Sequence, residues 1–102
     1  MAEPQFTPEQ KQQAHFLALV EMLTSGAMTA LGKMVNPGTG KEEEVNLEQA
    51  RFMIDLLESL QAKTQGNLQE VERKYLEMQL TNLRLTFVDE ANRQSKSGSS
   101  TP

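Results

Sequence analysis

The sequence contains no cysteine, no tryptophan, a single histidine, one tyrosine and four phenylalanines in 102 residues. The lack of cysteine excludes disulfides, thiolate catalysis and cysteine-ligated zinc or iron–sulfur sites. With one histidine, any metal site would depend on carboxylates, and we expect no metal and no cofactor. Because aromatic residues are few, aliphatic and methionine side chains must fill the core.

The charge balance is acidic, with ten basic and fourteen acidic residues and a net charge of -4. The chain as a whole therefore has no electrostatic reason to bind nucleic acid. Its first ten residues, MAEPQFTPEQ, lack a basic segment followed by an apolar run, so we expect no signal peptide and a cytoplasmic location. The longest apolar run, AHFLALVEMLTSGAMTALG, is interrupted by Glu21 and several polar residues, which argues against a membrane span.

The first predicted helix covers about residues 8–31. Thr7 can cap it, Pro8 suits the first helical position, and Gln10 stands where a capping box needs its partner. Apolar residues recur at steps of three and four, and Glu21 is the only formal charge after the first turn. The apolar sector therefore exceeds half the circumference, which indicates more than one packing neighbour.

The second predicted helix covers about residues 47–65 and the third about residues 68–92. Asn46 caps the second helix, Gly66 ends it, and Asn67 caps the third, so the short joint predicts an antiparallel pair. The second helix is amphipathic with one buried face. The third helix has two apolar stripes. The first stripe consists of Val71, Tyr75, Met78 and Leu85, and the second stripe of Leu76, Leu80, Leu83 and Phe87.

Together these signals predict an all-α protein, a three-helix bundle in which a long N-terminal helix packs on an antiparallel helical hairpin. We expect a single domain over residues 8–93. A flexible N-terminus, residues 1–7, should precede it. A tail rich in serine and glycine, residues 94–102, should follow it and be disordered.

The stretch VNPGTGKEEEVN between the first two helices combines a glycine–lysine turn with three consecutive glutamates, Glu42 to Glu44. A nucleotide phosphate loop needs four residues between its first Gly and its Gly-Lys pair, a Ser or Thr after the Lys, and a preceding strand. Here one residue separates Gly38 from Gly40 and Lys41, Glu42 follows the Lys, and no strand is predicted before the stretch. The glutamates would also repel a phosphate. Calcium loops alternate ligands with spacers, which adjacent glutamates do not. We therefore interpret the stretch as a turn followed by a solvated charge run.

Surplus apolar residues on the first helix and on the second stripe favour contacts between chains. The candidate interaction residues are Leu17, Met22, Gly26, Met28, Arg51, Asp55, Lys63, Thr64, Asn67, Leu76, Leu80, Leu83 and Phe87. Arg51 and Asp55 form an i,i+4 pair that is either a modest helix contact or a recognition surface. Core filling is the alternative role for the methionines. The row of small residues that includes Gly26 and Ala30 permits close helix approach, either between chains or inside the bundle.

Three sequence blocks, ALGKMVNPGTG, LEQARFMIDLLESLQAKTQGNL and LTNLRLTFV, follow one another in this order. In these blocks the chain resembles a bacterial family of small proteins, domain of unknown function 1844, over about residues 16–88. The resemblance implies a bacterial, helical, cytoplasmic protein and brings no catalytic residues. It suggests Lys63, Thr64 and Asn67, at the joint of the second and third helices, as a functional patch. Capping and turn geometry is the structural alternative for these three residues.

The leading functional hypothesis is a non-enzymatic interaction or scaffold module. It would form a homodimer or higher oligomer, or bind an unidentified protein, through the first helix and the second stripe. The alternative is a ribosome- or RNA-associated factor, against which the net acidity argues. Its basic residues would be Arg73, Lys74, Arg84, Arg93 and Lys96. A small enzyme is third, and would need carboxylates such as Glu21, Asp55 and Glu72 to meet in a buried cleft.

Overall fold

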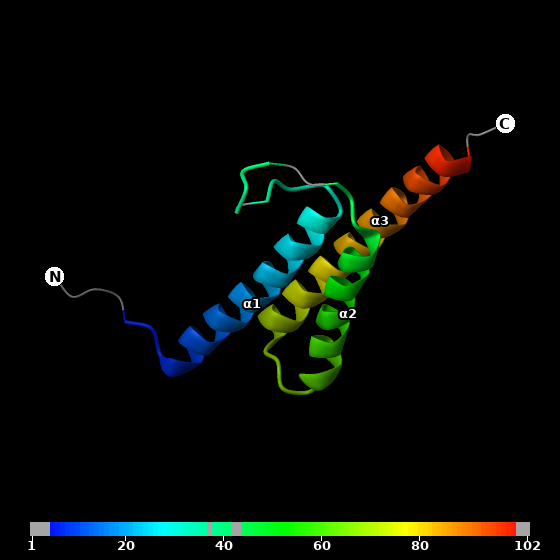
Figure 1. The fold of residues 1–102 in the computed structure, drawn as a ribbon. Coiled ribbons are helices and arrows are strands. Elements are labelled where there is room, and N and C mark those ends of the chain that lie inside the picture. Colours follow the sequence, from blue (N-terminus) through cyan, green and yellow to red (C-terminus); the bar gives the residue numbers. More distant parts are fainter. Residues whose placement is uncertain (1–4, 37, 42–43, 100–102) are drawn as a thin grey trace.

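The computed structural model describes residues 5–36, 38–41 and 44–99, and these ranges contain three α-helices and no strand. The helices are α1 (Pro8–Ala30), α2 (Leu47–Lys63) and α3 (Glu70–Ser99). α1 and α2 run in roughly opposite directions, and each helix contacts the other two (Figure 1). The predicted all-α, three-helix architecture is confirmed.

The start of α1 follows the sequence signals. The Thr7 hydroxyl accepts a hydrogen bond from the Gln10 backbone N–H at 3.1 Å, and the Gln10 side chain accepts one from the Thr7 N–H at 2.9 Å. This reciprocal pair is the predicted capping box, and it satisfies N–H groups that have no partner inside the helix. After α1 the chain turns away at Gly32, whose φ of 75° glycine adopts without strain.

The start of α2 is capped by Asn46, as the sequence predicts. Its side-chain oxygen accepts a hydrogen bond from the Gln49 N–H at 3.0 Å. The Asn46 N–H donates to the Ala30 carbonyl at 2.8 Å, so the cap of α2 is tied to the last residue of α1. This bond fixes where the two helices meet at this end of the bundle.

The connection between α1 and α2 contains the expected turn. The N–H groups of Gly38 and Gly40 donate to the side-chain and backbone oxygens of Asn36, each at 2.8 Å. These amides are therefore engaged within the turn and do not point at a common ligand position. Pro37 and two of the three glutamates of the charge run, residues 42 and 43, lie outside the described residues.

The cap of α3 differs from the prediction. The Asn67 N–H donates to the Thr64 carbonyl at 2.9 Å, so Asn67 belongs to the turn that follows α2. The helix begins at Glu70, and the Glu72 carboxylate accepts a hydrogen bond from the Gln69 N–H at 2.7 Å. Because the Asn67 N–H is already bonded within the turn after α2, the helix starts later, with Glu72 as the acceptor three residues after Gln69.

The end of α3 also differs from the expectation. The helix continues to Ser99, past the expected end near Asn92 and into the segment expected to be a disordered tail. Glu90 accepts hydrogen bonds from Arg93 at 3.1 Å and from Gln94 at 3.5 Å, and such contacts at steps of three and four favour continuation of the helix. Residues 100–102 of the expected tail and residues 1–4 of the expected flexible start lie outside the described part of the chain.

One hydrophobic core joins the three helices. It consists of Val20, Ala27, Ala30, Leu31, Ala50, Ile54, Leu57, Leu76, Leu80 and Leu83. The leucines of the second stripe, Leu76, Leu80 and Leu83, are 0% exposed and face α1 and α2. This stripe, expected to contact another chain, is instead used inside the chain, because burying it against α1 and α2 removes a continuous row of leucines from water.

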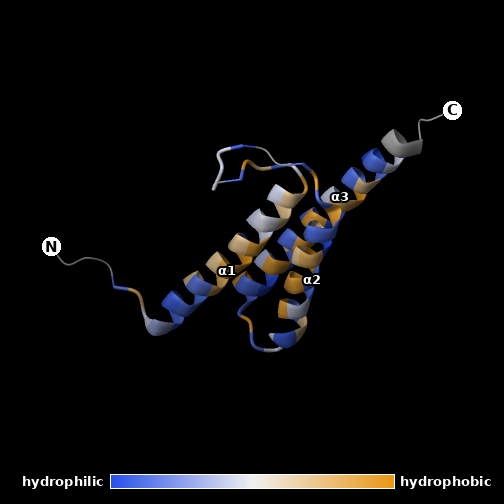
Figure 2. Ribbon diagram, in the orientation of Figure 1, coloured by the Kyte–Doolittle hydropathy of each residue, from blue (hydrophilic) through white to orange (hydrophobic). Residues whose placement is uncertain are grey.

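Hydropathy is uneven along the longer helices. The N-terminal turns of α1 and the turns of α3 around residues 91–95 are polar, whereas the apolar segments lie where the three helices meet (Figure 2). Within the described ranges, no helix combines the length and hydropathy that crossing a membrane requires.

Candidate interaction surface

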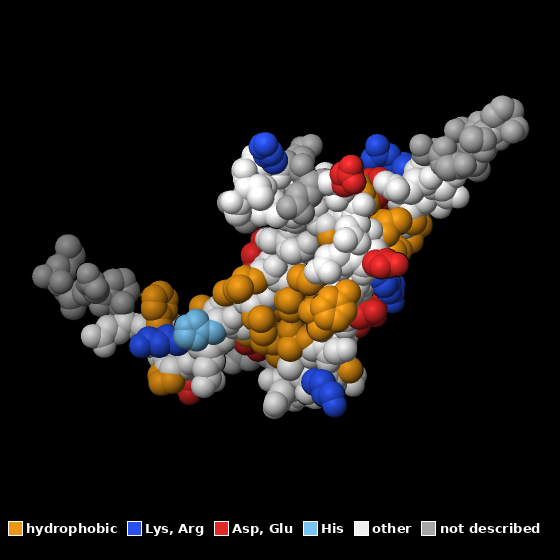
Figure 3. Space-filling model, in the orientation of Figure 1, with side chains coloured by type: hydrophobic (Ala, Val, Ile, Leu, Met, Phe, Trp, Pro, Cys, Tyr) orange, Lys and Arg blue, Asp and Glu red, His pale blue; other side chains and the backbone are white. Residues whose placement is uncertain are grey.

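Large apolar side chains are exposed on adjacent outer sides of α1 and α2. The Met22 side chain on α1 is 70% exposed and the Phe52 side chain on α2 is 55% exposed. Hydrophobic side chains gather into one patch over these two helices (Figure 3). We define the α1–α2 apolar surface as the exposed residues of this patch and the half-buried ones beside them: Leu19, Met22, Phe52, Met53, Leu56 and Leu60. None of its members carries a formal charge.

Gly26 explains how α1 and α2 pack at this surface. A Cβ atom at Gly26 would lie 2.5 Å from the Met53 Cε, so the missing side chain leaves space for the end of Met53. Met22 and Leu56 lie about one turn away from this contact, at the edge that faces water. Gly26, a predicted interaction residue, therefore serves the tight contact inside the bundle that was one of the two alternatives for the small-residue row.

A second exposed apolar row follows the outer side of α3. Val71, Met78 and Leu85 succeed one another at intervals of seven residues, and Leu85 is 66% exposed. These residues belong to the first stripe of the third predicted helix. The row occupies a single helix, so its exposed side chains form a narrow line, whereas those of the α1–α2 apolar surface spread over two adjacent helices.

Four charged residues join α2 to α3. Arg51 contacts Asp55 at 3.0 Å and Glu58 at 3.6 Å, and Arg84 contacts the same Glu58 at 2.9 Å. The predicted i,i+4 pair of Arg51 and Asp55 is present in this chain of contacts. Both side chains are about half exposed, so the pair contributes only a few tenths of a kcal/mol.

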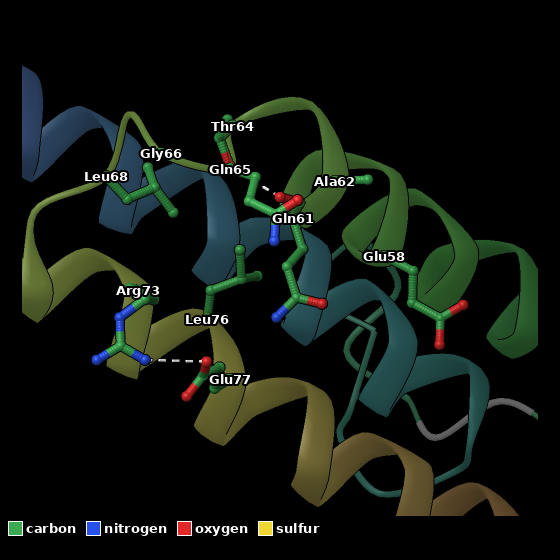
Figure 4. Close-up of a pocket in the computed structure, with 10 residues that line it drawn as sticks. All are labelled: Glu58, Gln61, Ala62, Thr64, Gln65, Gly66, Leu68, Arg73, Leu76 and Glu77. Atoms are coloured by element: carbon green, nitrogen blue, oxygen red, sulfur yellow. Dashed lines mark hydrogen bonds and ion pairs between the residues drawn. The ribbon is translucent and has the colours of Figure 1, made fainter.

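A groove of about 410 Å³ lies at the joint between α2 and α3 (Figure 4). Thr64 lines it from the end of α2, and the ion pair of Arg73 with Glu77, at 3.0 Å, lines it from α3. The Thr64 hydroxyl donates to the Leu60 carbonyl at 2.7 Å, which helps to end α2. Thr64 and Asn67 thus have the capping and turn roles of the structural alternative, and Lys63 is exposed beside them.

The remaining candidates lie nearer the core. Met28 and Phe87 are half-buried and pack against core residues, and Leu17 is half-buried on α1. Of the predicted interaction residues, Met22 alone belongs to the α1–α2 apolar surface. The sequence analysis missed Phe52, although its position at the boundary of the apolar half of α2 was a signal. A large apolar residue beside the polar half of an amphipathic helix favours an exposed contact surface.

The three carboxylates considered for catalysis have separate partners. Glu21 accepts a hydrogen bond from the Tyr75 hydroxyl, Asp55 pairs with Arg51, and Glu72 caps α3. Among the residues that the structure describes, no three His, Cys, Asp or Glu side chains converge as metal ligands would. The meeting of carboxylates in a buried cleft, which the enzyme hypothesis would need, is therefore not formed by these three groups.

Tyr75 and Glu21 make a polar contact between α3 and α1. The hydrogen bond from the Tyr75 hydroxyl to Glu21, together with partial burial and the Glu21 charge, raises the pKa of Tyr75 above its ordinary value of 10.0. Gln79 opposes this shift weakly. The phenol therefore keeps its proton, and the hydrogen bond, across the neutral pH range.

Glu90 on α3 makes a second polar contact, with Lys33 just after the C-terminal end of α1. Its side chain is 6% exposed and lies 3.3 Å from the Lys33 Nζ. Burial raises the pKa of Glu90, but hydrogen bonds from Lys33 and Gln94 and the charges of Arg93 and Lys33 outweigh burial, so the pKa lies below its ordinary value of 4.5. The ionised carboxylate thus holds the loop after α1 against α3.

Three contacting helices around one core, with an uncharged apolar surface on two of them, define a small all-α protein whose candidate site is a surface. The family model of a domain of unknown function, DUF1844, matches residues 13–89, and the chain therefore belongs to this family. The resemblance found in the sequence is confirmed, and the matched range includes the whole α1–α2 apolar surface. No curated protein and no solved structure matches the chain.

Proposed function

We propose that this protein is a non-enzymatic interaction module that self-associates, as a homodimer in the first instance, through the α1–α2 apolar surface. It would act as a scaffold in the bacterial cytoplasm. The observation that carries this proposal is the clustering of exposed, uncharged, large apolar side chains on two adjacent helices, with Met22 70% and Phe52 55% exposed.

The free energy of hydrating this surface favours a partner. Apolar area exposed to water costs about 25 cal/mol per Å². Contiguous apolar patches on monomeric proteins rarely exceed a few hundred Å², and larger ones mark interaction sites. Two copies of the chain each carry a net charge of -4 and repel one another through their charged faces. Contact through an uncharged face keeps the repulsion between them low.

The basic residues that an RNA-binding role would use support the protein-binding role instead. Every one whose side chain the structure describes has a carboxylate within 3.5 Å: Arg73, Lys74, Arg84 and Arg93. These cations are neutralised within the chain and offer little net positive charge to phosphates. The Lys96 side chain lies outside the described residues.

The proposal is tested by substituting the most exposed residue of the surface. Met22→Glu places a charge at the centre of the contact, whereas Met78→Glu makes the same change on the outer side of α3. We expect Met22→Glu to weaken self-association at least about tenfold, because burying an unpaired carboxylate costs several kcal/mol. Met78→Glu should leave the association constant unchanged.

Sedimentation equilibrium of the full chain over a range of micromolar concentrations would measure both constants. Circular dichroism of each variant would check that the helical content is retained. A wild-type chain that remains monomeric at every concentration would refute self-association. Loss of association in Met78→Glu but not in Met22→Glu would place the interface on α3 and refute the role of the α1–α2 apolar surface.

A further inference from the structure

The outer edge of α2 has a charge pattern that is symmetric in position and opposite in sign. The pattern is centred between Asp55 and Leu56. Glu48 lies seven residues before Asp55 and Lys63 lies seven residues after Leu56, and both side chains are exposed. At 100° per residue, Glu48, Leu56 and Lys63 lie within a sector of about 80° on the helix. Phe52 lies in the same sector, so this edge of α2 is acidic at one end, apolar in the middle and basic at the other end.

We propose that the occupant of the α1–α2 apolar surface is a second copy of the chain, packed antiparallel about a two-fold axis beside Leu56. In this arrangement Glu48 of each protomer pairs with Lys63 of the other. The inference rests on the proposed self-association and adds the partner's orientation and the residues that set it. Two symmetry-related ion pairs then flank one apolar contact, as an isologous interface requires.

α1 allows the same axis. Gly26 faces Met53, as the 2.5 Å distance from a Cβ at Gly26 to the Met53 Cε requires. Met22 is one turn before Gly26 on α1, and Leu56 is about one turn after Met53 on α2. Because α1 and α2 run in roughly opposite directions (Figure 1), Met22 and Leu56 are at about the same height along the bundle. A single two-fold axis can therefore bring Leu56 against Leu56 and Met22 against Met22.

The charges near the axis are compatible with two copies. Asp55 is the charged residue nearest the middle of the α2 edge, and Arg51 lies 3.0 Å from its carboxylate. The two Asp55 carboxylates therefore approach the axis as neutralised pairs. Glu48 and Lys63, by contrast, form no ion pair within the described part of their own chain, so their charges are available to the second copy.

The size of the surface is adequate for a specific dimer. α2 has 17 residues, and a helix of this length extends about 25 Å. Two adjacent helices, each about 10 Å wide, present about 500 Å² in projection, and their corrugated side chains expose more area than this. Specific interfaces bury roughly 800 Å² on each partner. The area that α1 and α2 together present to a partner is of this order.

Charge reversal tests the orientation. Glu48→Lys alone, or Lys63→Glu alone, turns both attractive pairs into repulsive ones, and we expect each to weaken the dimer about tenfold. The double variant Glu48→Lys/Lys63→Glu restores both pairs with the signs exchanged, so its dimerisation constant should return to the wild-type value. Asp89→Lys and Lys74→Glu, on α3, are controls with the same changes of net charge, and should leave dimerisation unchanged.

A zero-length carbodiimide crosslink gives an independent readout on the unmodified chain. Glu48 and Lys63 are 15 residues apart on one helix, about 22 Å, so a direct amide between them cannot form within a folded chain. We expect this crosslink between isotopically light and heavy copies. A wild-type chain that stays monomeric would overturn the proposed self-association itself. A dimer that lacks the crosslink, or whose double variant stays as weak as the single variants, would overturn only the antiparallel arrangement.

Discussion

At the scale of single residues, two leucines on α3 have opposite environments. Leu80 is fully buried against α1 and α2, whereas Leu85, five residues later, is 66% exposed. Leu80→Ala should lower the free energy of unfolding by about 2–5 kcal/mol, because it removes transfer free energy and leaves a cavity. Leu85→Ala should change it by no more than about 0.5 kcal/mol. Urea unfolding followed by circular dichroism would measure both.

The matched design makes the result easy to interpret, because the substitution, the helix and the helix-propensity change are the same at both positions. Equal losses at Leu80 and Leu85 would contradict the assignment of the second stripe to the core. The unfolding should be measured at a concentration where sedimentation finds only monomer, so that no contact between chains adds to the free energy of unfolding.

The choice between these two stripes could not be predicted from the sequence. Periodicity identifies both rows on the third helix, and their residue types are similarly apolar. The choice depends on where α1 and α2 lie, which is fixed by long-range contacts such as Met53 at Gly26 and the Asn46 N–H on the Ala30 carbonyl. Local patterns contain little information about such contacts. The sequence therefore predicted surplus apolar residues on the third helix but assigned the exposed role to the second stripe, whose leucines are buried, and not to the first.

At the scale of helices, local signals predicted the starts of α1 and α2 and failed at α3. Thr7 and Asn46 are each the only strong capping residue near their helix start, so the prediction had one solution. Near α3 the sequence offers two solutions, Asn67 with Glu70 or Gln69 with Glu72, and the second is the one adopted. Gly66 has a φ of 82° in the turn after α2, and in this turn the Asn67 N–H donates to the Thr64 carbonyl.

This correction leads to a test of the α3 cap. Glu72→Ala removes the carboxylate that accepts from the Gln69 N–H at 2.7 Å, and should lower the free energy of unfolding by about 1 kcal/mol. Asn67→Ala removes no cap and should cost less than about 0.5 kcal/mol. Glu72→Gln keeps an acceptor and should lie between the wild type and Glu72→Ala. A larger loss for Asn67→Ala than for Glu72→Ala in thermal or urea unfolding would reinstate Asn67 as the cap.

At the scale of the whole molecule, two polar contacts hold α3 against the middle of α1 and against the segment just after its C-terminal end. Tyr75 donates to Glu21 on α1, and Lys33, just after α1, lies 3.3 Å from the Glu90 carboxylate. The core residues Ala27 and Ala30 on α1, and Leu80 and Leu83 on α3, lie along their helices between these two contacts. Charged groups therefore occupy the edge of α1 that faces α3, while the α1–α2 apolar surface on the edge shared with α2 carries no charged member.

The contact between Lys33 and Glu90 makes stability depend on pH in a defined direction. The pKa of Glu90 is lower in the folded chain than its ordinary value of 4.5, so below that pH the unfolded chain takes up the proton more readily. The stabilisation is fully present above pH 4.5 and is lost as the pH falls through the folded pKa. Glu90→Gln should therefore be less stable than the wild type at neutral pH, and the difference should shrink below pH 4.5.

A double-mutant cycle isolates this contact from the other carboxylates of the chain, whose protonation affects all variants alike. Glu90→Gln, Lys33→Met and the double variant would be unfolded in urea at neutral pH and again well below pH 4.5. The coupling free energy between the two positions should be favourable at neutral pH and absent in acid, because a neutral carboxyl no longer attracts the ammonium group. A coupling that is the same at both pH values would show that Lys33 and Glu90 interact through packing and not through charge.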